Sequence, residues 1–469
     1  MNETSNDFST DNPKIKLIRG LGLFDSMGIV IGTIIGTGVF LKTANMSQAT
    51  GNPYIVLLAW AVAGVLSFSG ALAYAELGSL MPDAGGEYVY LKEGYGDMWA
   101  FLYGWMRFWI GAPGSVAAYS VAAMTFLSAA VDLKFIGGKQ VAAIAVILIF
   151  SLMNCLKVVL GGRIQGIMTS LKLISIFGVI VGIFFFSGSG TFEHLKESTA
   201  PANSLFSWLG ISSFATAMLG ALWAFDGWNN LSMIAGEIKN PQKNIPLSFG
   251  LGLTIIFVTY AMINLAYFYA LPFVDVLSAN SSLNPEALPV ATKAALTFLG
   301  TSGVMILALI CTFSGLSSMN AGIMTNARVP YAMAESGLFF KSLGRLSPTT
   351  HVPVVALLVQ AFISAVLVMS GTFDQLTDYV LFSSWIFYAM VTSVVFVMRK
   401  KMPNAPRYKT LGYPIVPIVF IVLGILLLIN TLYTMPLQSG IGLVLIVLGV
   451  PCYYYFKKHK PAGVSPAVN

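Results

Sequence analysis

Charged residues are scarce in this chain of 469 residues, in which Asp, Glu, Lys and Arg together make up only 10%. An average soluble protein carries about 25% charged residues, so the polar side chains here are too few to cover a water-soluble globule of this size. Hydrophobic residues reach 56%, and the mean hydropathy is +0.78. These values argue against a soluble enzyme, a disordered protein or a nucleic-acid-binding protein, and they favour a membrane protein.

Cysteine and histidine are scarce as well. The three cysteines and three histidines are Cys155, Cys311, Cys452, His194, His351 and His459. The cysteines lie in or beside apolar runs without a CxxC or metal-binding spacing, and the histidines lie in predicted loops or at the C-terminal end. The P-loop, HExxH and GxSxG motifs are also missing. We therefore expect no disulfide framework, no metal, no cofactor and no enzymatic activity.

Long apolar runs dominate the rest of the chain. A helix needs about 20 mostly apolar residues to cross a hydrocarbon core of about 30 Å. By this measure twelve spans are predicted, at 24–45, 53–81, 98–130, 137–159, 162–187, 206–237, 246–272, 290–335, 352–370, 376–399, 412–434 and 438–457. Helices satisfy their own backbone hydrogen bonds in lipid, so the prediction is an all-α polytopic membrane protein. We expect the eighth span to be long because its cytoplasmic end continues as a helix.

Lys and Arg are distributed unevenly between alternate loops. If both termini are cytoplasmic, 19 of the 26 Lys and Arg residues lie in inside loops and tails, 5 lie outside, and Arg107 and Lys172 fall within spans. Cytoplasmic loops carry an excess of these residues, so the bias predicts this orientation and explains the net charge of +7 without a nucleic-acid partner. The polar first 20 residues, with Lys14, Lys16 and Arg19, lead into a full span, so we expect no signal peptide.

Glycines interrupt the first span. Gly28, Gly32 and Gly36 recur every four residues, which is typical of a small-residue stripe that lets two helices pack closely. The stripe accounts for Gly28 and Gly32 but not for Gly38, which lies off it and completes the sequence Gly36-Thr37-Gly38. Two glycines around a threonine weaken a helix and leave backbone N–H groups without helical partners, as an anion site requires. We therefore favour an unwound segment here over a continuous helix.

The sixth span contains a carboxylate at membrane depth. Asp226 and Gly227 follow Trp223-Ala224-Phe225 in an otherwise apolar stretch. A charge at this depth costs at least a few kcal/mol, so it should face a cavity or a partner. Two roles stay open: Asp226 caps a second half-helix after Gly227, which we favour, or it contacts a substrate ammonium or cationic side chain. Two broken helices, each first in a set of five spans, are typical of an inverted-repeat transporter.

Lys172 is a second charge at membrane depth. It lies about ten residues into the fifth span and therefore near the midplane, at ~1.5 Å per residue. Its stem is too short to reach the interface, so we expect the ammonium to face the bundle, bonded to carbonyls of the broken first helix in the place of a sodium ion. Arg107 and Glu76 lie nearer the cytoplasmic ends of their spans, where an interfacial position or an ion pair is the default expectation.

Several motifs along the chain resemble one family. They are GTIIGTGVF (32–40), AYAELGSLMPDAGGEYVYLKEGYG (73–96), NC with GRIQ and LKL (154–173), WAFDGWNNLSMIAGEIKNPQKNIP (223–246), NLAYF (264–268) and SSMNAGIMTNAR (317–328). The whole chain is similar to the amino acid–polyamine–organocation (APC) superfamily. Within it, the GWN and GEIKNPQKNIP stretch and the lysine of the fifth span resemble the L-type amino acid transporters and their bacterial relatives.

The resemblance implies a LeuT-like fold with a 5+5 inverted repeat, broken helices 1 and 6, and two C-terminal helices. The expected parts are a cytoplasmic tail at 1–20, repeats at 21–190 and 200–400, two helices at 410–457 and a second cytoplasmic tail at 458–469. The substrate carboxylate would bind the N–H groups of Gly36, Thr37 and Gly38, at the start of a half-helix where the dipole favours an anion.

The resemblance also implies the other contacts of the substrate. The ammonium would face the carbonyls of Ile34, Trp223 and Asp226 at helix C-terminal ends. Trp223 takes the position of the family's aromatic gate. Asn320 and Tyr260 match positions that line the side-chain pocket and the network around the fifth-span lysine.

The function implied is sodium-independent exchange of small or medium neutral L-amino acids across the plasma membrane by alternating access. Asp226 stands where many neutral-amino-acid members have Gly and where a cationic-amino-acid and cystine member has Asp, so an exchanger of cationic amino acids stays an alternative. A proton-coupled symporter and a membrane amino acid sensor are further alternatives. A channel would need a continuous polar pore, whereas the polar residues cluster at two breaks.

The expected partners are amino acid substrates and the lipid bilayer. Eukaryotic light subunits of the family use a cysteine between the third and fourth spans to bond a heavy chain. The corresponding loop here, residues 132–140, contains no cysteine. We therefore expect the chain to work without a disulfide-linked heavy chain.

Overall fold

The computed structural model describes residues 17–128, 130–199, 207–281, 283–284, 286–370 and 373–460. Every named element in these ranges is a helix, and one isolated bridge, Leu21 to Ile238, is the only β pairing that they contain. The predictions made for residues 1–16, with Lys14 and Lys16, and for residues 461–469 lie outside the described residues. The fold is therefore that of an all-α membrane protein, as predicted.

The described residues up to 199 contain eleven helical elements. They are α1 (Leu23–Ile34), α2 (Gly38–Thr50), α3 (Pro53–Leu80), α4 (Glu87–Tyr95), α5 (Asp97–Met106), the π-helix η1 (Arg107–Gly111), α6 (Ala112–Leu127), η2 (Leu133–Ile136), α7 (Gly138–Asn154), α8 (Val158–Phe186) and η3 (Phe192–Lys196). Local sequence sets several ends. Gly51 ends α2 in a left-handed conformation, with φ of 64°, and the Asn52 side chain caps α3 by accepting from the Tyr54 N–H at 2.9 Å.

From residue 207 onwards the structure describes thirteen elements. They are α9 (Trp208–Phe225), α10 (Asn230–Met233), η4 (Ala235–Glu237), α11 (Pro241–Ala270), α12 (Phe273–Leu277), α13 (Val290–Leu299), α14 (Ser302–Asn326), α15 (Arg328–Glu335), η5 (Lys341–Gly344), α16 (Val354–Ser370), α17 (Phe373–Lys401), α18 (Ile415–Thr434) and α19 (Pro436–Lys458). Proline opens α11 and α19 at positions where its missing N–H costs no helical bond.

Nine helical stretches within the described ranges are long and apolar enough to cross a membrane. They are Leu23–Thr50, Pro53–Leu80, Asp97–Leu127, Val158–Phe186, Pro241–Ala270, Ser302–Glu335, Val380–Lys401, Ile415–Thr434 and Pro436–Lys458. The other three predicted spans coincide with shorter apolar helices, Gly138–Asn154, Gly210–Phe225 and Val354–Met369. Each predicted span thus contains an apolar helix.

The predicted eighth span, 290–335, is not one helix. Gly300 has φ of +57°, and it separates α13 from α14 by a turn. A positive φ is readily adopted only by glycine, so the chain changes direction here. The expectation of one long helix is therefore wrong for 290–299, whereas the stretch Ser302–Glu335 does form the long apolar helix expected at the other end.

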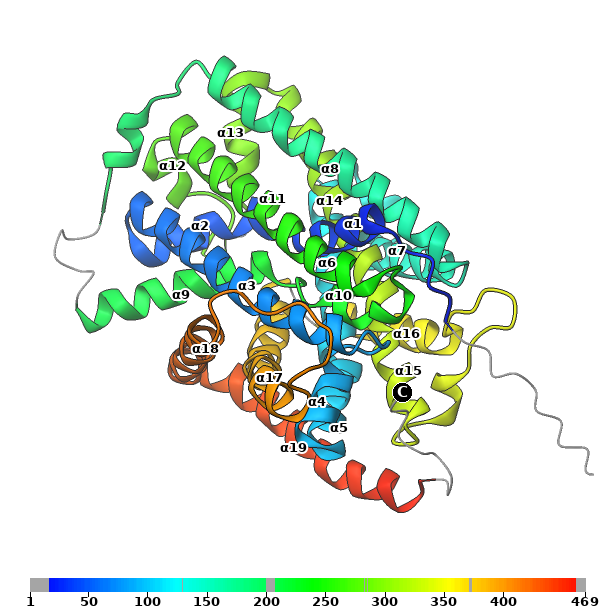
Figure 1. The fold of residues 1–469 in the computed structure, drawn as a ribbon. Helices are drawn as coiled ribbons and strands as arrows, with labels where there is room; N and C mark the ends of the chain where they lie inside the picture. The colour runs from blue at the N-terminus through cyan, green and yellow to red at the C-terminus, as the bar shows by residue number, and fades with distance from the viewer. Residues whose placement is uncertain are drawn as a thin grey trace, which may run out of the picture.

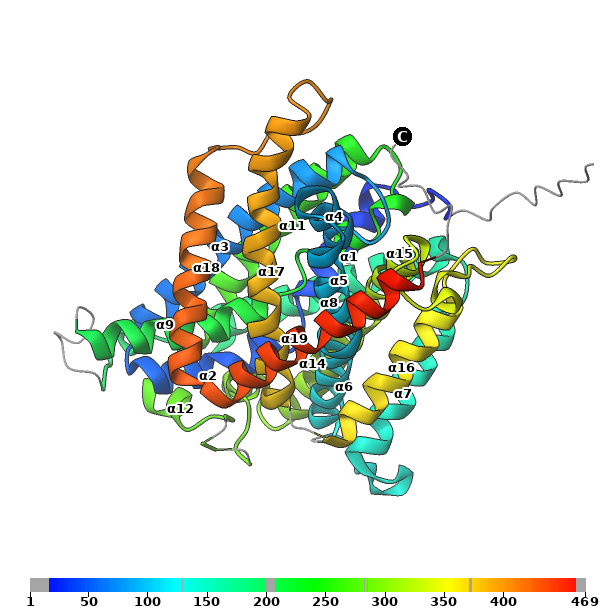
Figure 2. The same cartoon turned by 90° about the horizontal axis from the view of Figure 1, so that it is seen from below.

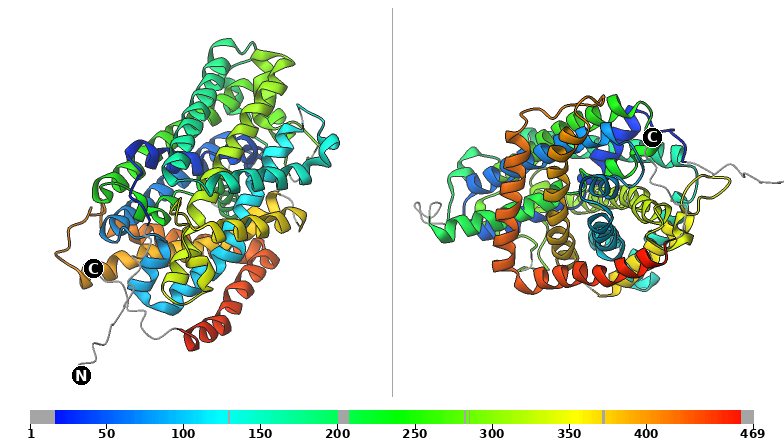
Figure 3. Two further views of the ribbon diagram at one scale, coloured as in Figure 1. Left: turned by 90° about the vertical axis from the view of Figure 1, so that its right-hand side faces the viewer. Right: turned by 60° about the horizontal axis from the view of Figure 1, so that its bottom comes forward.

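The two breaks lie towards the middle of the bundle. Figure 1 shows α1, α3, α10 and α11 near the centre and α2 extending to the left, and α1 packs against α8, α11 and α14 while α2 packs against α9. Figure 2 shows α17 beside α18, and the two views of Figure 3 show the red C-terminal helix α19 along an outer edge. A Cβ on Gly28 would lie 2.8 Å from the Gly166 Cα, so the glycine stripe does permit close packing of α1 on α8.

Candidate functional site

The two predicted helix breaks are present and lie against each other. The first separates Ile34, the last residue of α1, from Gly38, the first of α2, and the second lies between α9 and α10. The Thr33 hydroxyl donates to the Gly227 carbonyl at 3.1 Å, and a Cβ on Gly38 would lie 3.0 Å from the Ala224 Cα. The unwound residues of both helices therefore form one buried polar region.

The first break presents several polar groups that the protein does not satisfy. Thr37 is fully buried, and its Oγ1 has no hydrogen-bond partner in the part of the chain that the structure describes. Within the same residues, no acceptor pairs with the backbone N–H groups of Thr37 and Gly38. Gly36 differs from the prediction because its N–H donates to the Ile34 carbonyl at 2.7 Å, closing a tight turn. Two of the three predicted N–H donors thus remain for an anion.

Tyr260 of α11 bridges the C-terminal ends of α1 and α9. Its hydroxyl lies 3.0 Å from the Ile34 carbonyl and 2.8 Å from the Ala224 carbonyl. The Ile34 carbonyl also accepts from Gly36, so both of its lone pairs face donors, and a substrate ammonium would have to displace one of them. The Trp223 carbonyl accepts from the Asp226 N–H at 3.0 Å.

Lys172 of α8 makes the contacts that the sequence predicted. Its side chain is 1% exposed, and its Nζ lies 3.2 Å from the Gly32 carbonyl, in hydrogen-bonding contact with the Ile35 carbonyl and 3.2 Å from the Ser318 hydroxyl. The Ser318 hydroxyl itself lies 2.8 Å from the Gly32 carbonyl. The ammonium therefore fastens the unwound end of α1 to α8 and α14.

Asn320 lies two residues beyond Ser318 on α14, within a separate amide network. Its Nδ2 donates to the Gln165 Oε1 at 2.8 Å, and its Oδ1 accepts from the Asn154 Nδ2 at 2.7 Å. Both ends of the Asn320 amide are thus bonded to α7 and α8. The structure places this residue in the polar packing beside Lys172 and does not bring it to the unsatisfied groups of the first break.

Asp226 does not cap the second half-helix, so this prediction is wrong. It follows the last residue of α9, and its Oδ1 accepts from the Tyr388 hydroxyl of α17 at 2.8 Å. The second half-helix is short, begins only at Asn230 and has no side-chain cap. Three residues of irregular backbone separate the carboxylate from that helix, so its partners are the Tyr388 hydroxyl and the adjacent Gly227 N–H rather than the N–H groups of the half-helix.

Arg107 also differs from the expectation of an interfacial position. It is 3% exposed and begins the π-helix η1, an interruption often found at functional sites. Its guanidinium donates to Asn326 and lies 3.4 Å from the Asn230 Oδ1, and its charge acts favourably on Asp226 and Glu87. The other predicted ion-pair candidate, Glu76, does form one, with Arg399 at 2.7 Å.

Glu87, the first residue of α4, is a buried carboxylate that the sequence reasoning missed. It accepts from the Tyr74 hydroxyl at 2.8 Å, from the Asn229 amide at 2.9 Å and from the Tyr103 hydroxyl. The only sequence signal was its place in the GGEYVY motif, which pointed to the family and not to a role. Tyr388 and Tyr119 were also missed, because isolated tyrosines in apolar runs carry no pattern.

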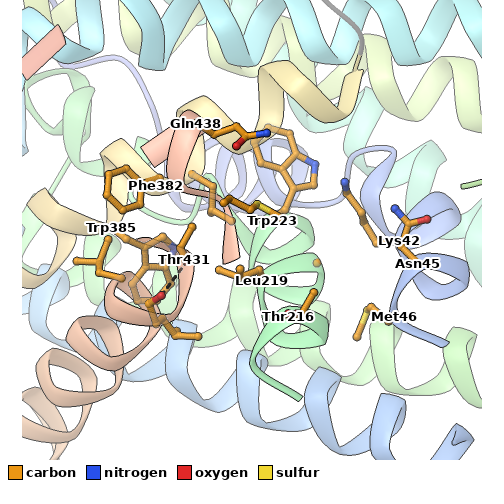
Figure 4. Close-up of a pocket in the computed structure, with 15 residues that line it drawn as sticks. Lys42, Asn45, Met46, Thr216, Leu219, Trp223, Phe382, Trp385, Thr431 and Gln438 are labelled. Atoms are coloured by element: carbon orange, nitrogen blue, oxygen red, sulfur yellow. Dashed lines mark hydrogen bonds between the residues drawn. The ribbon is translucent and has the colours of Figure 1, made fainter. Parts of the chain in front are cut away.

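Trp223 separates the breaks from a cavity of about 200 Å³ (Figure 4). The cavity is lined by Lys42, Asn45, Met46, Thr216, Leu219, Gly220, Trp223, Leu381, Phe382, Trp385, Leu427, Leu428, Thr431, Met435 and Gln438. The indole is 3% exposed, its ring centroid lies 6.0 Å from that of Tyr119, and a Cβ on Gly38 would lie 3.4 Å from its Cδ1. A side chain in this position can control passage between the cavity and the breaks.

The opposite end of the bundle is closed. We call it the inner end, defined by Leu21 and Ile238, and we call the end with Gly51 the outer end. A fully buried ion pair joins Arg328 to Glu237 at 2.7 Å at the inner end, and residues 221–235 are all buried. In the part of the chain that the structure describes, the residues between the breaks and the inner end are therefore buried, whereas the cavity beyond Trp223 lies in the outer half.

These features define a polytopic helical membrane protein with a buried polar site between two broken helices, an arrangement found in secondary transporters. Residues 21–451 match the family described as amino acid permease, so the chain belongs to this family of the APC superfamily and is an amino acid transporter. The family consists of transporters rather than enzymes.

Three relatives illustrate the similarity. The serine/threonine exchanger SteT of Bacillus subtilis is 31% identical over 95% of this chain and 98% of its own. The human b(0,+)-type amino acid transporter 1 is 28% identical over 100% of this chain and 94% of its own. The human cystine/glutamate transporter is 28% identical over 94% of this chain and 86% of its own. The similarity to these transporters thus extends over nearly the full length of this chain.

Proposed function

We propose that this chain is a sodium-independent exchanger of small or medium neutral L-amino acids. It would work in the plasma membrane with both termini cytoplasmic, as twelve spans in a LeuT-like 5+5 inverted repeat plus two helices. The observation that carries the proposal is the first break, where unsatisfied anion-binding groups stand next to a fixed ammonium. The Thr37 hydroxyl and N–H would receive the carboxylate, and Lys172 would order the same segment from behind.

The Lys172 ammonium supports sodium independence. Its contacts are two backbone carbonyls and one hydroxyl, which are the oxygen ligands that a hard cation would take in their place. A covalently attached cation that fills this position removes the need for a dissolved one. The break then keeps its shape without a sodium gradient.

The surroundings of Asp226 support a neutral substrate side chain. The carboxylate already accepts the Tyr388 hydroxyl at 2.8 Å and lies in the field of Arg107. A lysine or arginine substrate would bring a second positive charge beside Arg107, which Asp226 alone could not balance. The similarity to a serine/threonine exchanger agrees with a small neutral substrate.

Counterflow in proteoliposomes tests the proposal. We expect labelled serine or alanine outside to enter only when unlabelled amino acid is present inside, with the same rate in sodium and in choline. A rate that stays high without internal amino acid but follows a proton gradient would indicate a proton symporter. Binding without uptake would indicate a sensor, and strong competition by arginine would indicate a cationic-amino-acid exchanger.

A further inference from the structure

The Glu87 carboxylate accepts hydrogen bonds from two helices and from the turn before α10. The side chain is 0% exposed, and its donors come from α3 (Tyr74), from α5 (Tyr103) and from the irregular turn before α10 (Asn229). Hydrogen bonds to a charged acceptor are about twice as strong as neutral ones. The carboxylate thus binds the inner half of the sixth span to the second and third spans.

A chain of polar contacts connects Glu87 to the second break. The Asn229 Oδ1 lies 3.2 Å from the Tyr388 hydroxyl, which donates to Asp226 at 2.8 Å. Asn229 is therefore the residue through which the break and the Glu87 carboxylate are linked. Its Nδ2 is the donor, and an ionised carboxylate is an obligatory acceptor.

The loop that precedes Glu87 lies directly on α10. The Gly85 N–H donates to the Met233 carbonyl at 2.8 Å, and a Cβ on Gly86 would lie 2.5 Å from the Ser232 carbonyl carbon. This loop closes the path from the breaks to the inner end at α10. A path can open there only if α10 separates from the loop, and that movement breaks the bond between Asn229 and Glu87.

We propose that Glu87 is a positioning residue for transport, which holds the inner gate closed through the amide of Asn229. Release of this hydrogen bond is part of the step that exposes the substrate site to the inner side. The inference rests on the proposed function only in that the protein moves amino acids by alternating access, and the gate can be observed without any substrate.

A reversal of the hydrogen bond provides the test. Asn229→Asp places a second carboxylate against Glu87, and two carboxylates at this distance repel each other unless they share a proton. Glu87→Gln with Asn229→Asp restores a donor and an acceptor in the opposite order. The other titratable or charged groups that face Glu87 are unchanged; they are Tyr74, Tyr90, Tyr103, Arg107 and Tyr388.

A cysteine on α10 reports whether the gate is open. Ser232→Cys is introduced into the full chain after Cys155, Cys311 and Cys452 are replaced by alanine, and inside-out vesicles are treated with a membrane-impermeant maleimide. We expect Asn229→Asp to raise the labelling rate at least tenfold at pH 7.5. Acidification to pH 5.5 should reverse the rise, and the double variant should label at the parent rate at both pH values.

The matched control is Glu193→Gln, which removes an exposed carboxylate that pairs with Lys196 away from the gate, and it should label at the parent rate. The inference would be overturned if Asn229→Asp were labelled at the parent rate. It would also be overturned if the double variant were labelled as fast as Asn229→Asp. Parent-rate labelling of the double variant also excludes misfolding as the cause of the rise. A wild-type protein that exchanges no amino acid would refute the proposed function instead, and leave the labelling result standing.

Transport kinetics give a second readout. If Asn229→Asp lowers the outward-open fraction tenfold, the apparent KM for external substrate rises about tenfold. The maximal exchange rate and the internal KM should change much less. A variant that merely damages the fold would lower the maximal rate without this asymmetry between the two sides, which would count against the inference.

Discussion

Replacement of Lys172 is the most direct test of how the first break is held. Lys172→Met removes the ammonium and keeps most of the apolar stem. It removes the hydrogen bonds from Nζ to the carbonyls of Gly32, at 3.2 Å, and Ile35. Both carbonyls keep a second donor, because the Ser318 hydroxyl lies 2.8 Å from the Gly32 carbonyl and the Ser314 hydroxyl lies 3.2 Å from the Ile35 carbonyl. The variant therefore leaves no acceptor wholly unsatisfied.

The size of the effect follows from this arrangement. A hydrogen bond from a charged donor contributes about 1.5–3 kcal/mol, and the extra penalty for an orphaned carbonyl does not apply here. Loss of about 1.5–3 kcal/mol in the ordering of the break corresponds to a fall in substrate affinity of about 10- to 150-fold. We expect the apparent KM to rise by this factor. The amount of folded protein in the membrane should change little.

The assay is counterflow with the external and internal KM measured separately, in sodium and in choline. The control is Lys196→Met, since Lys196 is an exposed lysine paired with Glu193 and should show no change. In Lys172→Ala the shorter side chain leaves room among the same oxygens, so we expect sodium to stimulate this variant and not the wild type. A wild-type KM in Lys172→Met would refute the view that the ammonium orders the break.

Three further predictions concern the breaks. Gly38→Val should abolish uptake while membrane insertion stays normal, because the new Cβ would lie 3.0 Å from the Ala224 Cα and force α2 away from α9. In the wild type, amino-alcohol analogues should fail to compete with substrate. Asp226→Asn should keep uptake of alanine or serine within a few-fold, since its Oδ1 can still accept from Tyr388; selective loss of arginine uptake would contradict the neutral assignment. Tyr260→Phe should raise the KM about 2- to 10-fold, the effect of one lost hydrogen bond, and an unchanged KM would show that the hydroxyl is dispensable.

The helices and both breaks could be predicted because each depends on rules that act along one stretch of chain. The length of an apolar run sets a span, and Gly36-Thr37-Gly38 cannot sustain a helix whatever packs around it. Lys172 was predictable for a related reason. A charge at the midplane must find oxygens, and the unwound backbone of the first of the two helices predicted to be broken offered them.

The partners of Asp226 and Glu87 could not be predicted in this way. Each carboxylate requires a donor, but several tyrosine and asparagine side chains can supply one, and the choice depends on how helices far apart in sequence are placed. The cap proposed for Asp226 used the nearest backbone N–H groups, whereas the structure uses Tyr388, 162 residues away. Arg107 was misplaced because the π-helix that begins at this residue is not visible in the hydropathy.

The buried charges around the two breaks nevertheless obey a simple balance. In their ionised forms Lys172 and Arg107 carry two positive charges, and Asp226 and Glu87 carry two negative charges, so their sum is zero. A zwitterionic amino acid with an uncharged side chain adds no net charge to this region, whereas a cationic or acidic side chain adds one that has no counterpart among these four groups. Because an unbalanced charge in a low-dielectric site is costly, we expect the arrangement that stabilises the breaks to bind a neutral substrate in preference to a charged one, as proposed above.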